Sequence, residues 1–144
     1  AVVSRWESTV TDQFVPYLVP QEHGLHLGTR WMALEQIPGG EDPQGEAVGL
    51  LVVATGEPFG FSASHHHADD LWRSRHLVEL RPRAETVVHL DVAHRGLGTL
   101  SCGPDTAPRY RVGAGTYEWR WLLAAYRPGE VDPGTLARAL THRQ

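Results

Sequence analysis

The strongest constraint on the fold lies between Thr116 and Leu122, where aromatic and charged side chains alternate. Tyr117, Trp119 and Trp121 are separated by single charged residues. Successive side chains of a β-strand point to opposite faces, so the three rings share one face of an extended segment. An aromatic row of this kind needs a covering layer, and a second sheet supplies it in a sandwich. The segment therefore predicts a two-sheet β-sandwich.

Three further segments have the length and composition of strands, with glycine and proline turns between them. They are Gly28 to Gln36, Ala47 to Ala54, and Thr86 to Val92. The second is nearly continuously apolar, which is typical of a strand buried on both faces.

Two other segments read as helical. Ala68 to Leu80 has helical spacing of apolar residues and opens with two aspartates, which a helix N-terminus favours. Asp132-Pro133 is typical of an N-cap followed by a first-turn proline, so the tail has room for a short helix. We expect a mainly β, antiparallel sandwich with one short helix after Ser64.

Composition excludes several classes of function. The 144 residues suffice for one domain, and a net charge of −4 without a basic run gives no case for a nucleic-acid partner. No segment approaches the ~20 apolar residues of a membrane span, and the first residues are not a signal peptide. The single cysteine, Cys102, excludes an intrachain disulfide and fits a reducing compartment. We expect a cytoplasmic protein, and the missing initiator Met suggests a piece of a longer polypeptide.

The titratable residues do not form an evident catalytic or metal site. A retaining glycosidase needs two carboxyl groups ~5 Å apart, and no acidic pair here stands out. His65, His66 and His67 are followed by two aspartates, but adjacent histidines on an extended chain diverge, so surface histidines are favoured over a metal site. His76 lies beside Trp72 on the predicted helix and is interpreted as a structural histidine.

Five motifs occur in one order along the chain and resemble the C-terminal domain, also called the small chain or fifth domain, of bacterial β-galactosidases of glycoside hydrolase family 2. The resemblance covers about Arg5 to Leu123, so we place the domain at residues 1–123 and a tail at 124–144. In that family the domain is a galactose mutarotase-like supersandwich longer than this chain, so strands are expected to be missing at its N-terminal side. The motifs are Tyr17-Leu-Val-Pro-Gln-Glu-His-Gly24, Phe61-Ser-Ala63, Arg75-His-Leu-Val-Glu-Leu80, Gly96-Leu-Gly98 and Ser101-Cys-Gly-Pro104.

The resemblance implies a parent enzyme that hydrolyses terminal β-D-galactosyl residues by a retaining mechanism. Its catalytic carboxylates belong to a barrel domain, so this chain is expected to hold none and to be inactive alone. Its implied partners are the catalytic barrel, the other parent domains and the β-galactoside. We expect no cofactor in this chain, whereas the parent is expected to need Mg²⁺ and Na⁺. Missing strands also predict self-association, strand exchange or an exposed apolar patch.

The loop from His94 to Pro104 is the part expected to face the substrate cleft. Its candidate contacts are His94, Arg95, Ser101, Cys102 and Gly103. In the family this loop presents a tryptophan to the sugar, and that position falls on Cys102. A weaker sugar contact and a small buried thiol are equally compatible with the sequence.

Contact with another domain is expected at the polar loop of Gln21, Glu22 and His23, between a proline that fixes φ and a glycine that permits positive φ. His23 replaces the family's usual asparagine, and a purely structural loop is equally compatible. Arg30 is suited to pair with a carboxylate across a domain boundary or, the favoured reading, inside the sandwich.

Two functions of other classes remain open. A free-standing carbohydrate-binding module would present Trp31 or Trp72 as an exposed sugar platform. A mutarotase-like activity would need a converging His and Glu, for which His76 and Glu79 are poor candidates. The other tryptophans, Trp6, Trp119 and Trp121, are assigned to packing.

Overall fold

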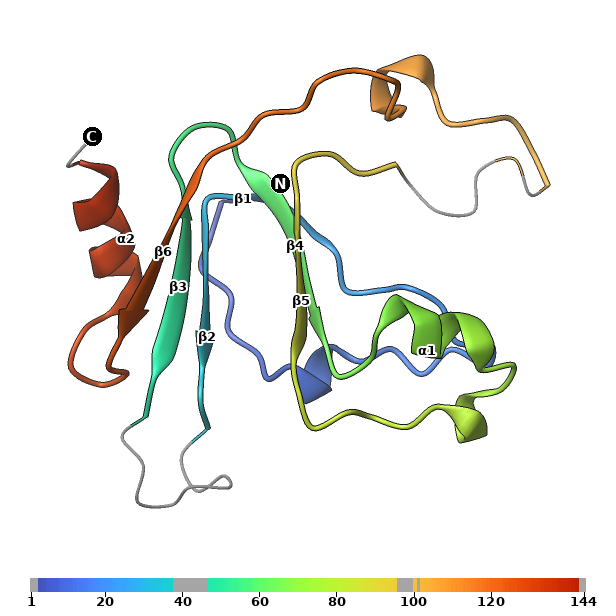
Figure 1. The fold of residues 1–144 in the computed structure, drawn as a ribbon, viewed down its shortest axis with the longest axis horizontal. Coiled ribbons are helices and arrows are strands. Elements are labelled where there is room, and N and C mark those ends of the chain that lie inside the picture. The colour runs from blue at the N-terminus through green and yellow to red at the C-terminus, as the bar shows by residue number, and fades with distance from the viewer. Residues whose placement is uncertain (1–2, 38–46, 96–99, 101, 143–144) are drawn as a thin grey trace. The chain divides into compact units, whose positions relative to one another are not determined.

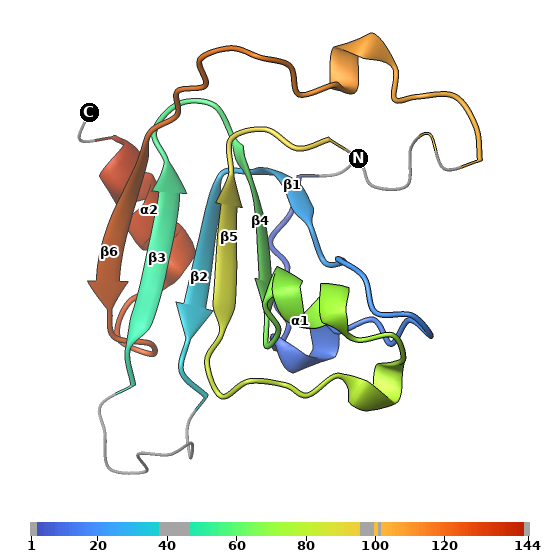
Figure 2. The same ribbon diagram turned by 45° about the vertical axis from the view of Figure 1, so that its right-hand side comes forward.

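A computed structural model describes residues 3–37, 47–95, 100 and 102–142 of the chain. The described chain is mainly β, with two three-stranded sheets in the orders β1-β4-β5 and β2-β3-β6 (Figures 1 and 2). This confirms the prediction of a mainly antiparallel β domain with two sheets and a short helix. The strands are β1 (His26–Thr29), β2 (Trp31–Glu35), β3 (Gly49–Ala54), β4 (Phe59–Ser64), β5 (Val87–Asp91) and β6 (Trp121–Tyr126), and the helices are α1 (Ala68–Arg73) and α2 (Pro133–Thr141).

The contacts between residues divide the chain into two compact units. The first unit contains residues 1–26 and 60–91, and the second contains residues 27–59 and 92–144. The predicted boundary between residues 123 and 124 stays a prediction, although β6 runs through it to Tyr126.

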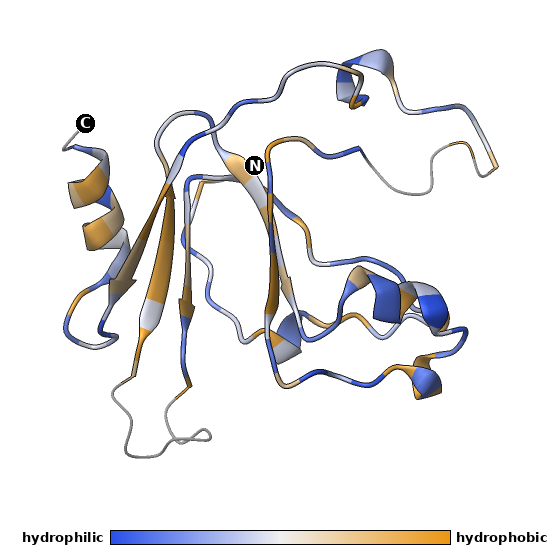
Figure 3. Ribbon diagram, in the orientation of Figure 1, coloured by the Kyte–Doolittle hydropathy of each residue, from blue (hydrophilic) through white to orange (hydrophobic). Residues whose placement is uncertain are grey.

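The core of the second unit lies between the β2-β3-β6 sheet and α2. Both strand pairs are antiparallel, and Leu51 of β3 faces Ala33 on β2 and Ala124 on β6. Apolar residues line β3 and α2, as the orange segments of Figure 3 show. The core residues are Leu51, Val53, Tyr126 and Ala137, with Trp31, Ala33, Leu122, Leu136 and Leu140 packed against them.

The start of α2 confirms the N-cap predicted from the sequence. The Asp132 carboxylate accepts a hydrogen bond from the Thr135 amide at 2.8 Å, and Pro133 occupies the first turn. The cap satisfies an amide that has no partner within the helix, and the proline lacks an amide to satisfy. The tail thus forms a helix whose Ala137 is buried against the sheet.

The prediction for the aromatic row is wrong in two respects. The strand begins at Trp121 rather than Thr116, and Tyr117, Trp119 and Trp121 are 43%, 36% and 39% exposed. The alternation itself is real, but the side chains turned inward are Leu122, Ala124 and Tyr126, on the opposite face. Alternation with a period of two residues distinguishes the two faces of a strand but does not say which face is covered. Here α2 packs on the face that carries Leu122 and Tyr126.

Two predicted elements are each divided. Residues Gly28 to Gln36 form β1 and β2 rather than one strand, because Gly28 takes a positive φ of 68° just before the chain turns at Arg30. The predicted helix from Ala68 to Leu80 ends at Arg73, and a separate 3₁₀ turn follows at Leu77–Glu79. The Glu79 carboxylate accepts a hydrogen bond from the Arg75 amide at 2.8 Å, which stabilises the non-helical connection.

The first unit pairs β4 with β5, and α1 lies in the connection between these two strands. The antiparallel register places Phe61 opposite Leu90 and Ala63 opposite Val88. Ala63, Leu71 and Leu80 are buried. Shorter 3₁₀ turns at Thr11–Gln13 and Pro108–Tyr110 lie in the first and second units respectively.

Candidate functional site

The loop predicted to face the substrate cleft is described in part. His94, Cys102 and Gly103 are exposed and Arg95 is half-buried, whereas Ser101 and residues 96–99 lie outside the described residues. Because the thiol of Cys102 is exposed, the interpretation as a small buried thiol is wrong. The loop therefore offers polar groups and a thiol to solvent from the second unit.

An acidic residue that sequence reasoning did not single out holds this loop. The Asp105 carboxylate forms an ion pair with Arg95, which comes before residues 96–104 in the sequence. It forms a second ion pair, at 3.2 Å, with Arg111, which comes after them. Asp105 also accepts the Thr106 amide at 2.7 Å, and Arg111 Nε donates to the Thr106 carbonyl at 2.6 Å. Two guanidinium groups on one half-buried carboxylate fix the residues that bracket the loop. The spacing of Arg95 and Asp105 around a glycine-rich segment was the available signal.

The loop predicted to contact another domain keeps its polar groups at the surface of the first unit. Gln21 and Glu22 are exposed, and Gly24 takes the positive φ of 75° that its position in the motif suggested. His23 is half-buried, and its Nδ1–H donates to the Gln21 carbonyl at 2.9 Å. Arg30 belongs to the second unit, where its side chain is exposed and its carbonyl accepts from the Ala54 amide at 2.8 Å. An exposed Arg30 does not have the interior ion-pair role that the sequence favoured.

His23 also lines a cavity of about 280 Å³ in the first unit. His66 and His65 contribute two further imidazoles, and the ring of Phe14 lies 5.3 Å from that of His23 and 5.2 Å from that of His66. The sequence indicated none of this convergence, because the three histidines come from segments about 40 residues apart. The other lining residues are Val10, Thr11, Ala63, Ser64, Leu77, Leu80 and Pro82.

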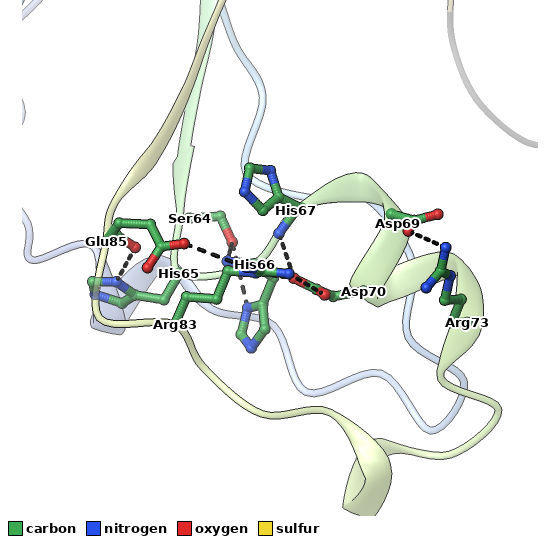
Figure 4. A network of polar contacts seen from close by, with 9 residues as sticks. All are labelled: Ser64, His65, His66, His67, Asp69, Asp70, Arg73, Arg83 and Glu85. Atoms are coloured by element: carbon green, nitrogen blue, oxygen red, sulfur yellow. Dashed lines mark hydrogen bonds and ion pairs between the residues drawn. The ribbon is translucent and has the colours of Figure 1, made fainter.

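The three consecutive histidines diverge, as the extended-chain argument predicts (Figure 4). His65 Nδ1–H donates to the Glu85 carbonyl at 3.3 Å, and His66 is buried with Nδ1 3.4 Å from Ser64 Oγ. His67 is exposed. In residues 3–37, 47–95 and 102–142, no three His, Cys, Asp or Glu side chains are grouped so that they could hold a metal ion.

Charges beside the cavity are paired within a network centred on Asp70. Arg83 donates to both carboxylate oxygens of Asp70, and the His67 amide donates to Oδ2 at 2.9 Å. The hydrogen bond from Arg83, followed by that from the His67 amide, holds the pKa of Asp70 well below its usual range. The same pairing raises the pKa of Arg83. Figure 4 shows this network between α1 and the segment before β5.

Burial lowers the pKa of His66 below its ordinary value of 6.5, and the nearby Asp70 opposes that shift. The imidazole is therefore neutral at pH 7. A neutral ring has one donor and one acceptor nitrogen, so His66 contributes a hydrogen-bonding group without a charge to the cavity wall.

Several residues weighed from the sequence lie on the open surface. His76 and Glu79 are exposed, and neither lines the cavity, which leaves the mutarotase-like constellation unformed. The interpretation of His76 as a core histidine is wrong. Trp72 is 87% and Trp6 is 83% exposed, so Trp6 has no packing role in the described chain, while Trp31 packs against the core of the second unit.

Across the part of the chain that the structure describes, no helix has the length and apolar character needed to traverse a membrane.

Residues 1–123 match the family described as "Beta galactosidase small chain". The chain is 34% identical over 102 residues to the β-galactosidase small subunit of Latilactobacillus sakei, covering 69% of this chain and 32% of that protein. It is 33% identical over 106 residues to a β-galactosidase of Streptococcus thermophilus, covering 74% and 9%, and 26% identical over 118 residues to that of Actinobacillus pleuropneumoniae, covering 82% and 10%.

The match therefore spans about a third of the small subunit and about a tenth of the longer relatives. The family match over residues 1–123 includes the loop of Gln21 to Gly24, the cavity and the Asp105 cluster. The chain belongs to the β-galactosidase small-chain family.

Proposed function

We propose that this chain is a supporting domain of a β-galactosidase that hydrolyses terminal β-D-galactosyl residues. The family match over residues 1–123 carries the proposal. The catalytic carboxylates then belong to the barrel of the parent enzyme, and the isolated chain is inactive.

The loop of residues 94–104 is proposed to line part of the substrate cleft. Support comes from Asp105, whose pairing with Arg95 and Arg111 fixes both ends of a loop that exposes His94 and Cys102.

Contact with the barrel and the other parent domains is proposed for Gln21, Glu22, His23 and Arg30. Support comes from the exposure of three of these side chains and from the rigid turn that Gly24 permits. The L. sakei relative bears the name of a small subunit, and by analogy this chain joins a larger catalytic partner. We also propose a cytoplasmic location and place any Mg²⁺ or Na⁺ requirement in the rest of the parent.

Reconstitution tests this division of labour. The 144-residue chain and the barrel-bearing remainder of the enzyme are produced separately and assayed with o-nitrophenyl β-D-galactopyranoside, alone and together. We expect no turnover by the chain, weak or no turnover by the remainder, and a clear gain when they are mixed. Light scattering during size-exclusion chromatography measures association and self-association in the same samples. Turnover by the chain alone, or no association with the remainder, contradicts the proposal.

One observation favours a carbohydrate-binding module as a second candidate. Trp72 on α1 is 87% exposed, as a sugar platform requires, although Trp31 is not available because it packs in the core. Titration of the chain with galactose, followed by tryptophan fluorescence in the wild type and in Trp72→Ala, separates the two functions. A saturable fluorescence change that Trp72→Ala abolishes supports the carbohydrate-binding module. No fluorescence change on addition of galactose supports the role of a supporting domain.

A further inference from the structure

The cavity of the first unit opens beside exposed apolar side chains. Leu77, which lines the cavity, donates its amide to the Leu18 carbonyl at 3.2 Å, so residues 17–19 lie against residues 77–78. Leu18, Val19 and Val78 are 81%, 59% and 75% exposed. Apolar side chains gathered around a pocket are typical of a protein interface, in which a central pocket receives an anchor residue.

The cavity wall selects an uncharged occupant with an apolar body. Its lining contains no aspartate, glutamate, lysine or arginine, and most of it is apolar, including Phe14, Leu77 and Leu80. A charged group placed there would lose hydration without gaining a partner of opposite charge.

The imidazoles of the wall select a hydrogen-bond donor on that occupant. His23 and His65 each donate Nδ1–H to a carbonyl, and in a ring that carries its proton on Nδ1 alone the Nε2 atom is an acceptor. Within the described part of the chain, neither Nε2 atom receives a hydrogen bond. An occupant with one O–H or N–H group beside an apolar ring can donate to one of these acceptors.

We propose that this cavity is the docking site for a tyrosine or tryptophan side chain presented by the remainder of the β-galactosidase. Its volume of about 280 Å³ lies below the usual range for small-molecule sites, roughly 300–1,000 Å³, and suits a single aromatic side chain. Tyrosine and tryptophan are enriched among interface anchors, and each combines an aromatic body with one donor. The relatives contain chain beyond the matched segment to supply it, since that segment is about a tenth of their length. The inference rests on the proposed function.

Side-chain analogues test the cavity in the 144-residue chain without any partner. The probes are p-cresol and indole, with toluene as the analogue that lacks a donor and D-galactose as a sugar ligand. Amide chemical shifts of Ala63 and His66 report binding. We expect both donor probes to shift these amides and toluene to bind about tenfold more weakly, the scale of one hydrogen bond. Equal binding of toluene, stronger binding of galactose, or no binding of either donor probe overturns the inference.

Cavity-filling variants connect the cavity to assembly. Ala63 is buried in β4 and lines the cavity, so Ala63→Leu fills it, and Ala139→Leu on the exposed surface of α2 is the matched control. Thr11→Phe fills the same cavity from an exposed backbone position and serves if Ala63→Leu does not fold. We expect the filled variants to lose p-cresol binding and to associate with the remainder of the enzyme at least about tenfold more weakly, whereas Ala139→Leu matches the wild type.

The outcomes distinguish a failure of the proposed function from a failure of this inference alone. If the wild type does not associate with the remainder, the proposed function fails and the inference falls with it. If the wild type associates and the filled variants associate equally well, only the inference is overturned.

Discussion

Asp70 and Arg83 join the start of α1 to the segment before β5 through a two-point ion pair. Arg83 Nε lies 2.6 Å from Asp70 Oδ2, and Nη2 lies 2.8 Å from Oδ1. The Arg83 amide also donates to the His65 carbonyl at 2.7 Å. Arg83 therefore holds the start of α1 and His65 against the segment before β5, beside the cavity that His65 and His66 help to line. A planar guanidinium makes both bonds at once, which an ammonium cannot do.

Replacing Arg83 should loosen this part of the first unit. We expect Arg83→Ala to lower the melting temperature by a few degrees, and Arg83→Lys to recover only part of the loss because it cannot bind both oxygens. Arg73→Ala is the control, since it removes an exposed i,i+4 pair with Asp69 on the same helix. Thermal unfolding followed by circular dichroism measures the melting temperatures of the three variants. Equal effects of Arg83→Ala and Arg73→Ala would show that the two-point geometry adds nothing.

Stability should fall on acidification in two steps. Burial lowers the pKa of His66 in the folded chain, so the unfolded chain binds the proton more readily. Stability is therefore highest above pH 6.5 and decreases as the pH falls from 6.5 through the folded-state pKa. The pKa of Asp70 is also depressed, so its contribution is complete above pH 3.8 and is lost as the pH falls through its lower folded-state value.

Urea unfolding between pH 7.5 and 5 isolates the first step. His66→Phe cannot be protonated, and we expect its free energy of unfolding to vary less over this range than that of the wild type. His67→Phe, at the exposed neighbouring position, is the control. Asp70, His23, His65 and Arg83 also act on the His66 ring, and they are unchanged in both variants. If both variants retain the wild-type slope, another group causes the pH dependence.

Local rules predicted most elements of this fold, and the error over the aromatic row has a physical cause that those rules do not include. The Asp132-Pro133 cap and the apolar run of β3 are decided by neighbouring residues, and both are found. The aromatic row of Tyr117, Trp119 and Trp121 depends on what covers it, and the sequence pattern does not contain that information.

The candidate site also contains contacts that the sequence predicted and contacts that it did not. The divergence of His65, His66 and His67 follows from the geometry of an extended chain and was predicted. The cavity depends on His23 and His66 lining the same space. The Asp105 cluster depends on ion pairs between Asp105 and both Arg95 and Arg111. The histidines come from segments about 40 residues apart, which periodicity and spacing do not reveal, whereas the spacing of Arg95 and Asp105 around a glycine-rich segment was a usable signal.

Gly49 should not tolerate even a methyl group. It lies opposite Tyr126 in the β3–β6 pair, and a Cβ atom at Gly49 would overlap the tyrosine ring. The Tyr126 hydroxyl donates to the Glu35 carboxylate, which keeps the ring in place. We expect Gly49→Ala to cost about 1–3 kcal/mol in the free energy of unfolding. Gly56→Ala, where a Cβ would meet open space, is the control in urea unfolding, and equal stability of the two would contradict this packing.

Asp105 should matter for substrate use although it is not placed to react. In the reconstituted enzyme, Asp105→Ala frees the bracketing Arg95 and Arg111, and we expect kcat/KM for the chromogenic galactoside to fall about tenfold. Glu118→Ala removes an exposed carboxylate from the neighbouring segment and should leave kcat/KM unchanged. Association with the remainder is measured in parallel by light scattering. A loss of association that accounts for the whole effect would place Asp105 in assembly instead of cleft formation.

The family resemblance predicts that Cys102 stands where relatives present a tryptophan to the sugar, and its thiol is exposed. In the reconstituted enzyme, we expect Cys102→Trp to lower KM about two- to tenfold, because an aromatic ring packs against the apolar face of galactose. Cys102→Ser removes the thiol without adding a ring and should leave KM near the wild-type value. In the chain alone, the thiol should react with a disulfide reagent without denaturant, which confirms its exposure independently. An unchanged KM in Cys102→Trp, with association intact, would show that this loop does not reach the substrate.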